Sequence, residues 1–323
     1  MRSDGVLLLN LGTPESPEPT AVGRYLREFL MDPHVIDVPW LVRWPLVNLA
    51  IVPRRSVSSA ALYRKIWTDR GSPLLFHTLD LAQAVGAMLG EGVPVRAAMR
   101  YGPPGIARGL KELADCRRIA VLPLYPQYSL AATESSIGYV TRVAARLGIG
   151  AELRFLPAFY DRAPYLDAVA EVSRAHLARP HDAVLFSFHG LPARQIRRAT
   201  RTDPTRCYRT QCFATARALA VRLGVPEEKY HVGFQSRMAG TPWIQPYSDA
   251  HYRELPARGI RRIAVLCPSF VADCLETLEE VSLRGLEEFR HHGGEDLFLV
   301  PSLNAEPVWA DAVAGFAREL LSP

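Results

Sequence analysis

Arg117-Arg118-Ile119-Ala120-Val121-Leu122 recurs letter for letter as Arg261-Arg262-Ile263-Ala264-Val265-Leu266. A second match lies in the same order along the chain and at one constant offset. It pairs Val6-Leu7, Gly12 and Pro14 with Val184-Leu185, Gly190 and Pro192. Because short apolar matches arise by chance but two in the same order do so less readily, we interpret the chain as two related modules.

Each module alternates apolar runs of strand length with longer amphipathic stretches, which is the pattern of a parallel sheet with crossover helices. The first module is expected to hold strands near residues 5–10, 94–100 and 118–124, with helices near 19–30, 57–66, 78–89 and 131–146. The second is expected to hold strands near 152–156, 183–188, 230–235 and 262–267, with helices near 163–177, 208–223, 248–257 and 273–290. A final helix near 306–321 is expected to pack back on the first module.

The predicted fold class is therefore α/β, with two similar Rossmann-like domains, parallel sheets and a cleft between them. We expect the first domain over residues 1–148 plus the C-terminal helix within 303–323, and the second over residues 149–302. The length of 323 residues supports two domains, since single hydrophobic cores tend to divide near this size.

Composition excludes several classes of protein. With 48% apolar and 22% charged residues the chain is not intrinsically disordered. The net charge of +5 comes mostly from dispersed arginines, so a nucleic-acid-binding stripe is not indicated. Neither Gly-x-Gly-x-x-Gly nor Gly-x-x-x-x-Gly-Lys occurs, so dinucleotide and nucleoside triphosphate sites lack their backbone cradle. Arginine also binds carboxylates in a bidentate manner, which leaves an acidic small molecule open as ligand.

The N-terminus and the cysteines indicate a cytoplasmic protein. Met1-Arg2-Ser3-Asp4 leads directly into a short apolar run, which leaves no room for a signal peptide. Five cysteines, an odd number, favour reduced thiols, and the Cys207/Cys212 spacing is not that of a tight metal-binding pair. The apolar stretch Trp40 to Val52 is too short to span a bilayer but long enough to touch one, so peripheral contact with the inner membrane stays open.

The stretch Ser187-Phe188-His189-Gly190-Leu191-Pro192 follows an apolar run and places an imidazole where a buried strand opens into a turn. Ligands of open parallel sheets bind outside the carboxyl ends of the strands, and histidine titrates nearest to neutral pH. His189 is either a catalytic group or a hydrogen-bonded turn residue. In the duplicated position the first module carries Leu11, so the two halves of the predicted cleft are chemically unlike.

Asp273, Glu276 and Glu280 are spaced by three and four residues and would share one face of a helix. One interpretation is helix capping, because acidic residues favour the first turn. The other is a row of oxygen ligands or proton acceptors near His189, since imidazole with carboxylate suits a first-row divalent cation.

Aromatic, hydroxyl and basic side chains follow other predicted strands. Surface exposure and packing are the ordinary explanations for such residues, whereas together they also describe a deep, aromatic and partly cationic pocket. The candidates for that pocket are Arg54, Arg55, Tyr63, Arg100, Tyr101, Tyr125, Ser129, Thr133 and Trp243.

At these residues the sequence closely resembles the ferrochelatases, which insert ferrous iron into a porphyrin to make haem. The resemblance runs from Leu8 to Asn304 and rests on eight motifs in family order. They are Leu8-Asn10-Leu11-Gly12-Thr13-Pro14, Phe29-Leu30-Met31-Asp32-Pro33, Gly71-Ser72-Pro73-Leu74, Met99-Arg100-Tyr101-Gly102, Tyr125-Pro126-Gln127-Tyr128-Ser129, Ser187-Phe188-His189-Gly190-Leu191-Pro192, Phe234-Gln235-Ser236-Arg237 and Leu275-Glu276-Thr277.

The resemblance implies an activity and roles for particular residues. The activity is insertion of Fe²⁺ into protoporphyrin IX with release of two protons, the terminal step of haem biosynthesis. His189 matches the active-site histidine, Glu276 its carboxylate partner, and Glu280 a path of acidic residues, and these three are the predicted metal contacts. The remaining matches are pocket positions (Tyr101, Tyr125 and Trp243), basic residues near the propionates (Arg54 and Arg55), and the apolar lip (residues 40–52).

Three departures from the family pattern sharpen this expectation. Leu11 stands where coproporphyrin-using relatives have tyrosine, which favours protoporphyrin IX. Leu130 stands where animal enzymes have a cluster-ligating cysteine, so no iron–sulfur cluster or other cofactor is expected beyond the substrate Fe²⁺. Cys274 stands where some members have histidine, so a thiol replaces a second imidazole.

Two other functions stay open at this point. One is a sirohydrochlorin chelatase for cobalt or nickel, which shares the fold, and the other is a tetrapyrrole carrier without turnover. The sequence favours a monomer without determining the oligomeric state, and it does not identify an iron donor.

Overall fold

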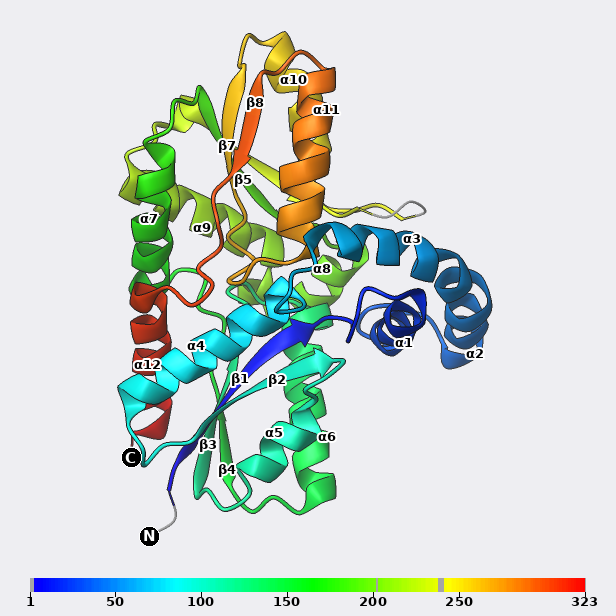
Figure 1. The fold of residues 1–323 in the computed structure, drawn as a ribbon, viewed down its shortest axis with the longest axis vertical. Coiled ribbons are helices and arrows are strands. Elements are labelled where there is room, and N and C mark those ends of the chain that lie inside the picture. Colours follow the sequence, from blue (N-terminus) through cyan, green and yellow to red (C-terminus); the bar gives the residue numbers. More distant parts are fainter. Residues whose placement is uncertain (1–2, 202, 238–240, 323) are drawn as a thin grey trace. The chain divides into compact units, whose positions relative to one another are not determined.

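The computed structural model describes residues 3–201, 203–237 and 241–322, which fall into two α/β units (Figure 1). The first unit comprises Met1–Tyr125, Leu130–Pro157 and Ala310–Pro323, and the second comprises Pro126–Ser129 and Ala158–Trp309. These boundaries differ from the predicted breaks after residues 148 and 302 because of local pairing and packing. Residues 152–155 join the first sheet, and Trp309 packs against Phe159 and Tyr165 of the second unit.

Four parallel strands form the sheet of the first unit, in the order β2-β1-β3-β4. They are β1 (Gly5–Gly12), β2 (Val95–Tyr101), β3 (Arg118–Pro123) and β4 (Glu152–Phe155). Every residue of β3 is buried, because helices cover both faces of a parallel sheet. This explains why the central strands read as continuous apolar runs rather than as alternating ones.

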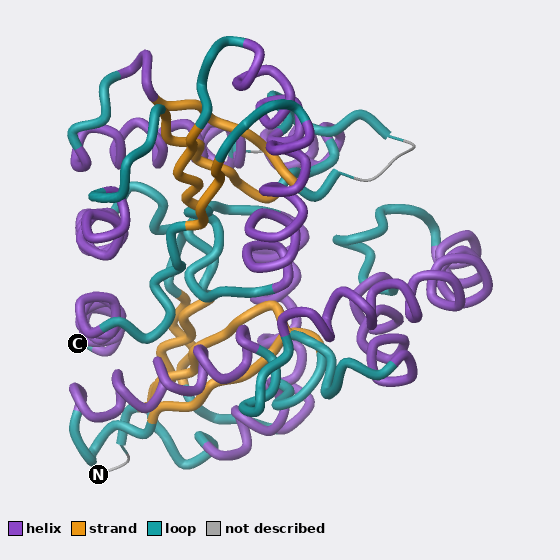
Figure 2. Tube along the Cα trace, turned by 45° about the horizontal axis from the view of Figure 1, so that its top comes forward, coloured by secondary structure: helices purple, strands orange, loops and turns teal. Residues whose placement is uncertain are grey.

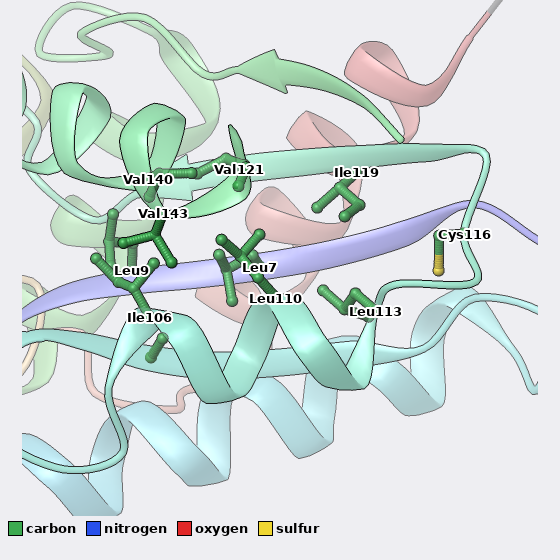
Figure 3. Packing of buried hydrophobic residues seen from close by; sticks show 12 residues of the cluster. Leu7, Leu9, Ile106, Leu110, Leu113, Cys116, Ile119, Val121, Val140 and Val143 are labelled. Atoms are coloured by element: carbon green, nitrogen blue, oxygen red, sulfur yellow. The ribbon is translucent and has the colours of Figure 1, made fainter. Parts of the chain in front are cut away.

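The helices of the first unit divide between the two faces of its sheet. Leu7 and Leu9 of β1 pack on one face against Leu110 and Val140, which belong to the two helices on that side (Figure 3). Alternate strand residues point to the opposite face, where α4 contacts β1 and β2. The helical elements are α1 (Pro19–Leu30), α2 (Trp40–Pro45), α3 (Val52–Ile66), α4 (Pro73–Leu89), α5 (Ile106–Glu112) and α6 (Ser135–Leu147), with π-helical segments η1 (Leu46–Ile51) and η2 (Leu130–Glu134).

The second unit has a sheet of the same kind, in the order β6-β5-β7-β8. Its strands are β5 (Ala183–His189), β6 (Tyr230–Gln235), β7 (Arg262–Leu266) and β8 (Asp296–Leu299). Leu185 and Val265 pack against side chains that include Tyr252 and Phe289. The strands of each unit lie alongside one another with helices around them (Figure 2). The helical elements are α7 (Ala163–Leu177), α8 (Ala193–Thr200), η3 (Pro204–Arg206), α9 (Tyr208–Leu223), η4 (Glu227–Lys229), α10 (Ser248–Ala257), the π-helical η5 (Glu276–Gly285) and α11 (Leu286–His291).

The two sheets confirm the internal repeat, because each has its first strand between its second and third and its fourth strand at one edge. The repeated hexapeptide falls on β3 and β7. An ion pair that the sequence comparison did not reveal is repeated as well. Asp4, which precedes β1, has its Oδ2 2.7 Å from Nη2 of Arg118. Asp182, which precedes β5, has its Oδ1 3.6 Å from Nη2 of Arg262.

The repeated glycines Gly12 and Gly190 share a steric cause. A Cβ on Gly12 would lie 1.8 Å from the carbonyl oxygen of Tyr101, and one on Gly190 would lie 2.6 Å from the carbonyl oxygen of Gln235. In each unit the glycine thus lets the end of the first strand approach the end of the second strand. The close approach fixes where the functional turn after β5 begins.

Several predicted elements need correction. The strand near 152–156 is predicted for the second module, but that prediction is wrong, since β4 pairs with β3 in the first sheet. The strand β8 and the helices α2, α5 and α8 are not predicted, because they are short and lack a sustained apolar period. The final helix α12 (Pro307–Leu321) does pack back on the first unit, where Arg154 donates to the carbonyl of Leu320 over 3.0 Å.

The segment that contains residues 40–52 is amphipathic in the structure. Val47 and Val52 face inward and pack with Leu30, whereas the other side of the segment exposes large apolar residues. Within residues 40–52 the exposed ones are Trp40, Leu41, Val42, Trp44, Leu46 and Leu49, and these form the apolar lip. Among the helices of the described residues, none is both long and apolar enough to cross a membrane.

A histidine pair in the second unit predicts acid sensitivity. His231 of β6 lies 5.4 Å from His251 between ring centroids, and its Nε2 is buried without a hydrogen bond among the described residues. Burial, together with the His251 and Arg258 charges, lowers the pKa of His231 from 6.5 to about 4. Between these values the unfolded chain binds a proton that the folded chain does not, so the free energy of unfolding decreases as the pH falls through this window.

We expect His231→Gln to remove part of this pH dependence. The measurement is urea unfolding of both proteins at about pH 7 and about pH 5, comparing the change in free energy of unfolding. The wild type is expected to lose more stability than the variant on acidification. Equal losses would contradict the assignment to His231.

Candidate functional site

Two side chains hold the backbone of His189 at the end of β5. Its N–H donates to the Ser269 hydroxyl over 3.1 Å, and the Tyr208 hydroxyl donates to its carbonyl oxygen over 2.9 Å. The ring lies 6.1 Å from that of Phe270. These contacts satisfy main-chain groups that lie beyond the strand ladder and confirm that the imidazole sits where the strand opens into a turn.

One ring nitrogen of His189 has a defined role. Nδ1 lies 2.5 Å from the carbonyl oxygen of Gly190. Because a carbonyl oxygen only accepts hydrogen bonds, Nδ1 carries the proton in the neutral ring and Nε2 carries the lone pair. No hydrogen-bond partner of Nε2 occurs among the described residues, and the imidazole is half-buried. The geometry therefore presents a free nitrogen lone pair at the strand end.

Glu276 and Glu280 both lie on η5, which begins at Glu276. Both carboxylate oxygens of Glu280 are bound by Ser236, through its N–H over 2.7 Å and its hydroxyl over 2.6 Å. Burial raises the pKa of Glu280, and the Glu276 charge adds to this, whereas the Ser236 bond and the charges of Arg284 and His189 oppose it. The imidazole and the two carboxylates are thus close enough to interact electrostatically.

Asp273 differs from the two glutamates. Its buried carboxylate accepts from the Thr277 hydroxyl over 3.0 Å and from the Asn304 amide over 2.9 Å. Asp273 is therefore a structural residue that does not join a row of ligands, but helix capping is not its role, because η5 begins at Glu276 and has no side-chain cap hydrogen bond. Within the described part of the chain, no three His, Cys, Asp or Glu side chains form a ready-made metal site, and this includes His189, Glu276 and Glu280.

Trp243 lies against the turn that follows His189. A Cβ on Gly190 would be 3.1 Å from its ring, and Ile244 bonds to the carbonyl of Leu191 over 3.0 Å. The indole N–H is buried without a hydrogen-bond partner in the described residues. Cys274 is also buried, and its burial, together with the Glu276 charge, raises the pKa of its thiol. A neutral thiol is a poor metal ligand, which favours inert packing of Cys274.

In the first unit, Arg100 and Tyr101 belong to a buried network around Asp32. Arg100 forms an ion pair with Asp32, and the Tyr101 hydroxyl donates to the same carboxylate over 2.9 Å. Ser135 donates to it over 2.5 Å. Because the Arg100 charge is already compensated, the structure disfavours a role for this residue in binding a ligand carboxylate.

The other candidates of the first unit fall into two groups. Arg54 and Arg55 are exposed on α3, as residues that bind an anionic group from solvent should be. Leu11 is half-buried at the end of β1. Tyr63 and Thr133 are buried, and Tyr63 packs edge-on against Tyr25. Tyr125 is half-buried, and desolvation raises the pKa of its hydroxyl. Ser129, which belongs to the second unit, is buried too.

Several residues that bind the backbone of His189 or Glu276 were not predicted from the sequence. Ser269 and Tyr208 bind the backbone of His189, and Gln235 binds the first residue of η5 over 2.8 Å. No local signal marks Ser269 or Tyr208, because each acts on a backbone that is distant in sequence. Gln235 and Asp32 do lie in motifs that the sequence shares with a known family, which marks their importance but not their partners.

Two parallel four-stranded sheets of the same strand order, the second with a histidine at the end of β5, define a duplicated α/β fold that is also found in solved structures of chelatases. The fold is similar to SirB from Bacillus subtilis with Fe³⁺, at a TM-score of 0.55 and 14% identity, covering 99% of this chain and 96% of that one. It is also similar to CbiX, the terminal enzyme of sirohaem biosynthesis in denitrifying bacteria, at a TM-score of 0.52 and 17% identity, covering 98% and 100%.

The family model named Ferrochelatase matches residues 3–321, and the chain belongs to the ferrochelatase family. It is 44% identical to the ferrochelatase of Pseudomonas aeruginosa PAO1, with 100% of both chains covered. It is also 44% identical to the ferrochelatase of Coxiella burnetii RSA 493, with 98% of this chain and 94% of the relative covered. Members of this family are lyases of haem biosynthesis that insert ferrous iron into a porphyrin.

Proposed function

We propose that this chain inserts Fe²⁺ into protoporphyrin IX to form protohaem, with release of two protons, and that His189 carries the metalation. The single observation that supports this role is the geometry of the His189 ring, whose Nδ1 is bound by the Gly190 carbonyl while Nε2 stays free. Family membership over residues 3–321 supports the reaction itself.

The reaction asks for a base, because the free-base porphyrin must lose two pyrrole protons as the cation sheds water and enters the ring. The Nε2 lone pair of His189 accepts a proton from a pyrrole nitrogen or holds the iron on the same face, and both roles use the same atom. Glu276 supports the imidazole, and Glu280, whose pKa is raised by burial, takes protons onward. Bending of the macrocycle exposes the nitrogen lone pairs and draws on binding energy from elsewhere in the pocket.

The proposed porphyrin contacts are the residues that match pocket positions of the family, with the exposed arginines as partners of the propionates. They comprise Leu11, Arg54, Arg55, Tyr63, Tyr125, Ser129, Thr133 and Trp243, whereas Arg100 and the fully buried Tyr101 support them through Asp32. The neutral Leu11 at the end of β1 favours protoporphyrin IX over coproporphyrin, whose additional carboxylates need polar partners.

A comparison of substrates tests this proposal. Initial rates are measured anaerobically from visible spectra, with protoporphyrin IX, coproporphyrin or sirohydrochlorin and with ferrous, cobalt or nickel ion. We expect the highest rate with protoporphyrin IX and Fe²⁺. A strong preference for coproporphyrin would contradict the role of Leu11, and turnover of sirohydrochlorin alone would contradict the proposed reaction.

We also propose that the protein is cytoplasmic and attaches peripherally to an anionic membrane through the apolar lip. Its exposed tryptophans and leucines adjoin Arg54 and Arg55, and this combination of apolar and basic groups suits a lipid interface. Flotation with anionic liposomes in low salt tests the attachment, and Trp40→Ser with Leu41→Ser is expected to weaken it. Wild-type protein that stays entirely unbound would contradict it.

We further propose that Fe²⁺ enters only as substrate and that the enzyme needs no iron–sulfur cluster. The support is the sequence pattern, with Leu130 in place of a cluster-ligating cysteine. Iron and acid-labile sulfide measured in the purified protein test this, and a stable red-brown preparation with both would contradict it.

A further inference from the structure

Gln235 is a buried amide that the proposed reaction does not use. It is the last residue of β6, is 4% exposed, and lies opposite His189 in the pairing of β5 with β6. Gln235 therefore sits beside the proposed metalation residue without being directed at solvent. A buried amide in such a place is stable only when its polar atoms are hydrogen-bonded.

The side chain of Gln235 bridges two elements. Its Nε2 donates to the main-chain carbonyl of Glu276 over 2.8 Å, and its Oε1 accepts from the Ser187 hydroxyl over 2.7 Å. The carbonyl of Glu276 only accepts, so the orientation of the amide is determined. Ser187 in turn lies 2.7 Å from the Ser248 hydroxyl, which must donate because the Ser187 proton is used. The result is one directed chain of hydrogen bonds from α10 through β5 and β6 to η5.

The main chain of Gln235 makes a third connection. Its carbonyl oxygen accepts from the N–H of Gly190 over 2.8 Å, and a Cβ on Gly190 would come within 2.6 Å of that oxygen. The carbonyl of the same Gly190 binds Nδ1 of His189. Gln235 thus holds the site in two ways. Its main chain holds the turn that orients the imidazole of His189, and its side chain holds Glu276, the first residue of η5.

We propose that Gln235 is a positioning residue that sets the place of Glu276 relative to His189. This inference rests on the proposed function, because it gives these two residues their roles. Gln235 does not touch the reacting atoms. Its loss leaves the pocket in place but allows η5 to shift at its first residue, and displacements of about 1 Å can cost about 100-fold in rate.

The test uses Gln235→Met, which keeps the length of the side chain and removes both hydrogen bonds. We expect kcat to fall about 10- to 100-fold, while KM for protoporphyrin IX stays within about twofold, since the porphyrin contacts are unchanged. A second variant, Ser187→Ala, removes the hydroxyl donor to Oε1 but leaves the weaker Cys267 thiol donor at 3.7 Å, so it is expected to lower kcat by a smaller factor. Thermal unfolding of each variant is recorded alongside.

Ser173→Ala is the matched control in the same unit. Ser173 is 1% exposed and its hydroxyl donates to the Val169 carbonyl over 2.6 Å on α7, so the variant loses a buried hydroxyl of the same kind. We expect its kcat to be unchanged. Folded Gln235→Met with wild-type kcat, or with its loss confined to KM, would overturn the positioning role.

If Gln235→Met does not fold, the comparison of Ser187→Ala with Ser173→Ala decides, and equal kcat values would overturn the inference. A wild-type protein that metalates no porphyrin would overturn the proposed function and the positioning role with it. An active wild type with a folded Gln235→Met variant of wild-type kcat overturns the positioning role alone, so the two failures can be told apart.

Discussion

His189→Ala is expected to lower the rate of metal insertion at least about 100-fold, while protoporphyrin IX still binds. The variant removes the Nε2 lone pair, which is the free nitrogen at the end of β5, and with it both the proton acceptor and the metal donor. Because His189 is half-buried in a turn held by its backbone, the fold should survive the change. Initial rates are read from the visible spectrum under anaerobic conditions, and binding from quenching of porphyrin fluorescence.

His181→Ala provides the matched control. His181 precedes the same strand, and its Nδ1 is likewise bound by a backbone carbonyl, that of Arg179, at 2.8 Å. Only its position differs, since it lies at the opposite end of β5. We expect an unchanged rate for this variant. Substantial turnover by His189→Ala, or an equal loss in both variants, would refute the assignment.

Asp32→Asn is expected to lower the free energy of unfolding by about 3–5 kcal/mol, because it leaves the buried Arg100 guanidinium without its counter-ion. The Asp32 side chain is 3% exposed and that of Arg100 is 7% exposed. Burial by itself raises the pKa of Asp32, but the hydrogen bonds from Ser135 and the His34 N–H and the Arg100 charge together hold it below its usual value. The stabilisation is therefore present above the ordinary aspartate pKa and is lost as the pH falls.

Urea unfolding of Asp32→Asn beside Asp80→Asn measures this effect. Asp80 forms an ion pair with Arg70 at 2.7 Å in the same unit, but the Arg70 side chain is 59% exposed. Such a surface pair contributes little to stability because solvent screens it. A loss of stability in Asp32→Asn no larger than in Asp80→Asn would show that the buried network does not anchor Arg100 and Tyr101 as described.

The repeat made the fold predictable from sequence. Two apolar matches in one order indicated two like sheets, and β1, β3, β5 and β7 fall on or beside the repeated residues. The strand β4 was assigned to the wrong module because nothing in its four residues indicates which strand they pair with. Its pairing with β3 depends on residues that are distant in sequence. Short helices such as α8 could not be predicted for a related reason. They are stabilised by packing in the fold, and their sequences are too short to show a helical period of apolar residues.

The candidate site was predictable at residues whose side chains have a distinctive chemistry, such as the imidazole of histidine. His189 stood out as an imidazole after a buried strand, and its position is confirmed. Asp273 could not be told from Glu276 and Glu280 by spacing, because the residues that occupy its carboxylate, among them Asn304, are remote in sequence. Arg100 looked like an anion-binding residue for the same reason, since its partner Asp32 lies on another segment. The side chains of Gln235 and Tyr208 bind backbone carbonyl groups of residues that are distant in sequence, and no residue pattern reveals such partners.

The most direct test of the central claim is the amount of protohaem formed by wild-type protein at a small fraction of the concentration of protoporphyrin IX and Fe²⁺. We expect each chain to convert many porphyrins, so that the spectrum of the free base is replaced completely by that of protohaem. Conversion that stops at one porphyrin per chain, or a spectral shift without protohaem, would contradict it and would identify a carrier instead.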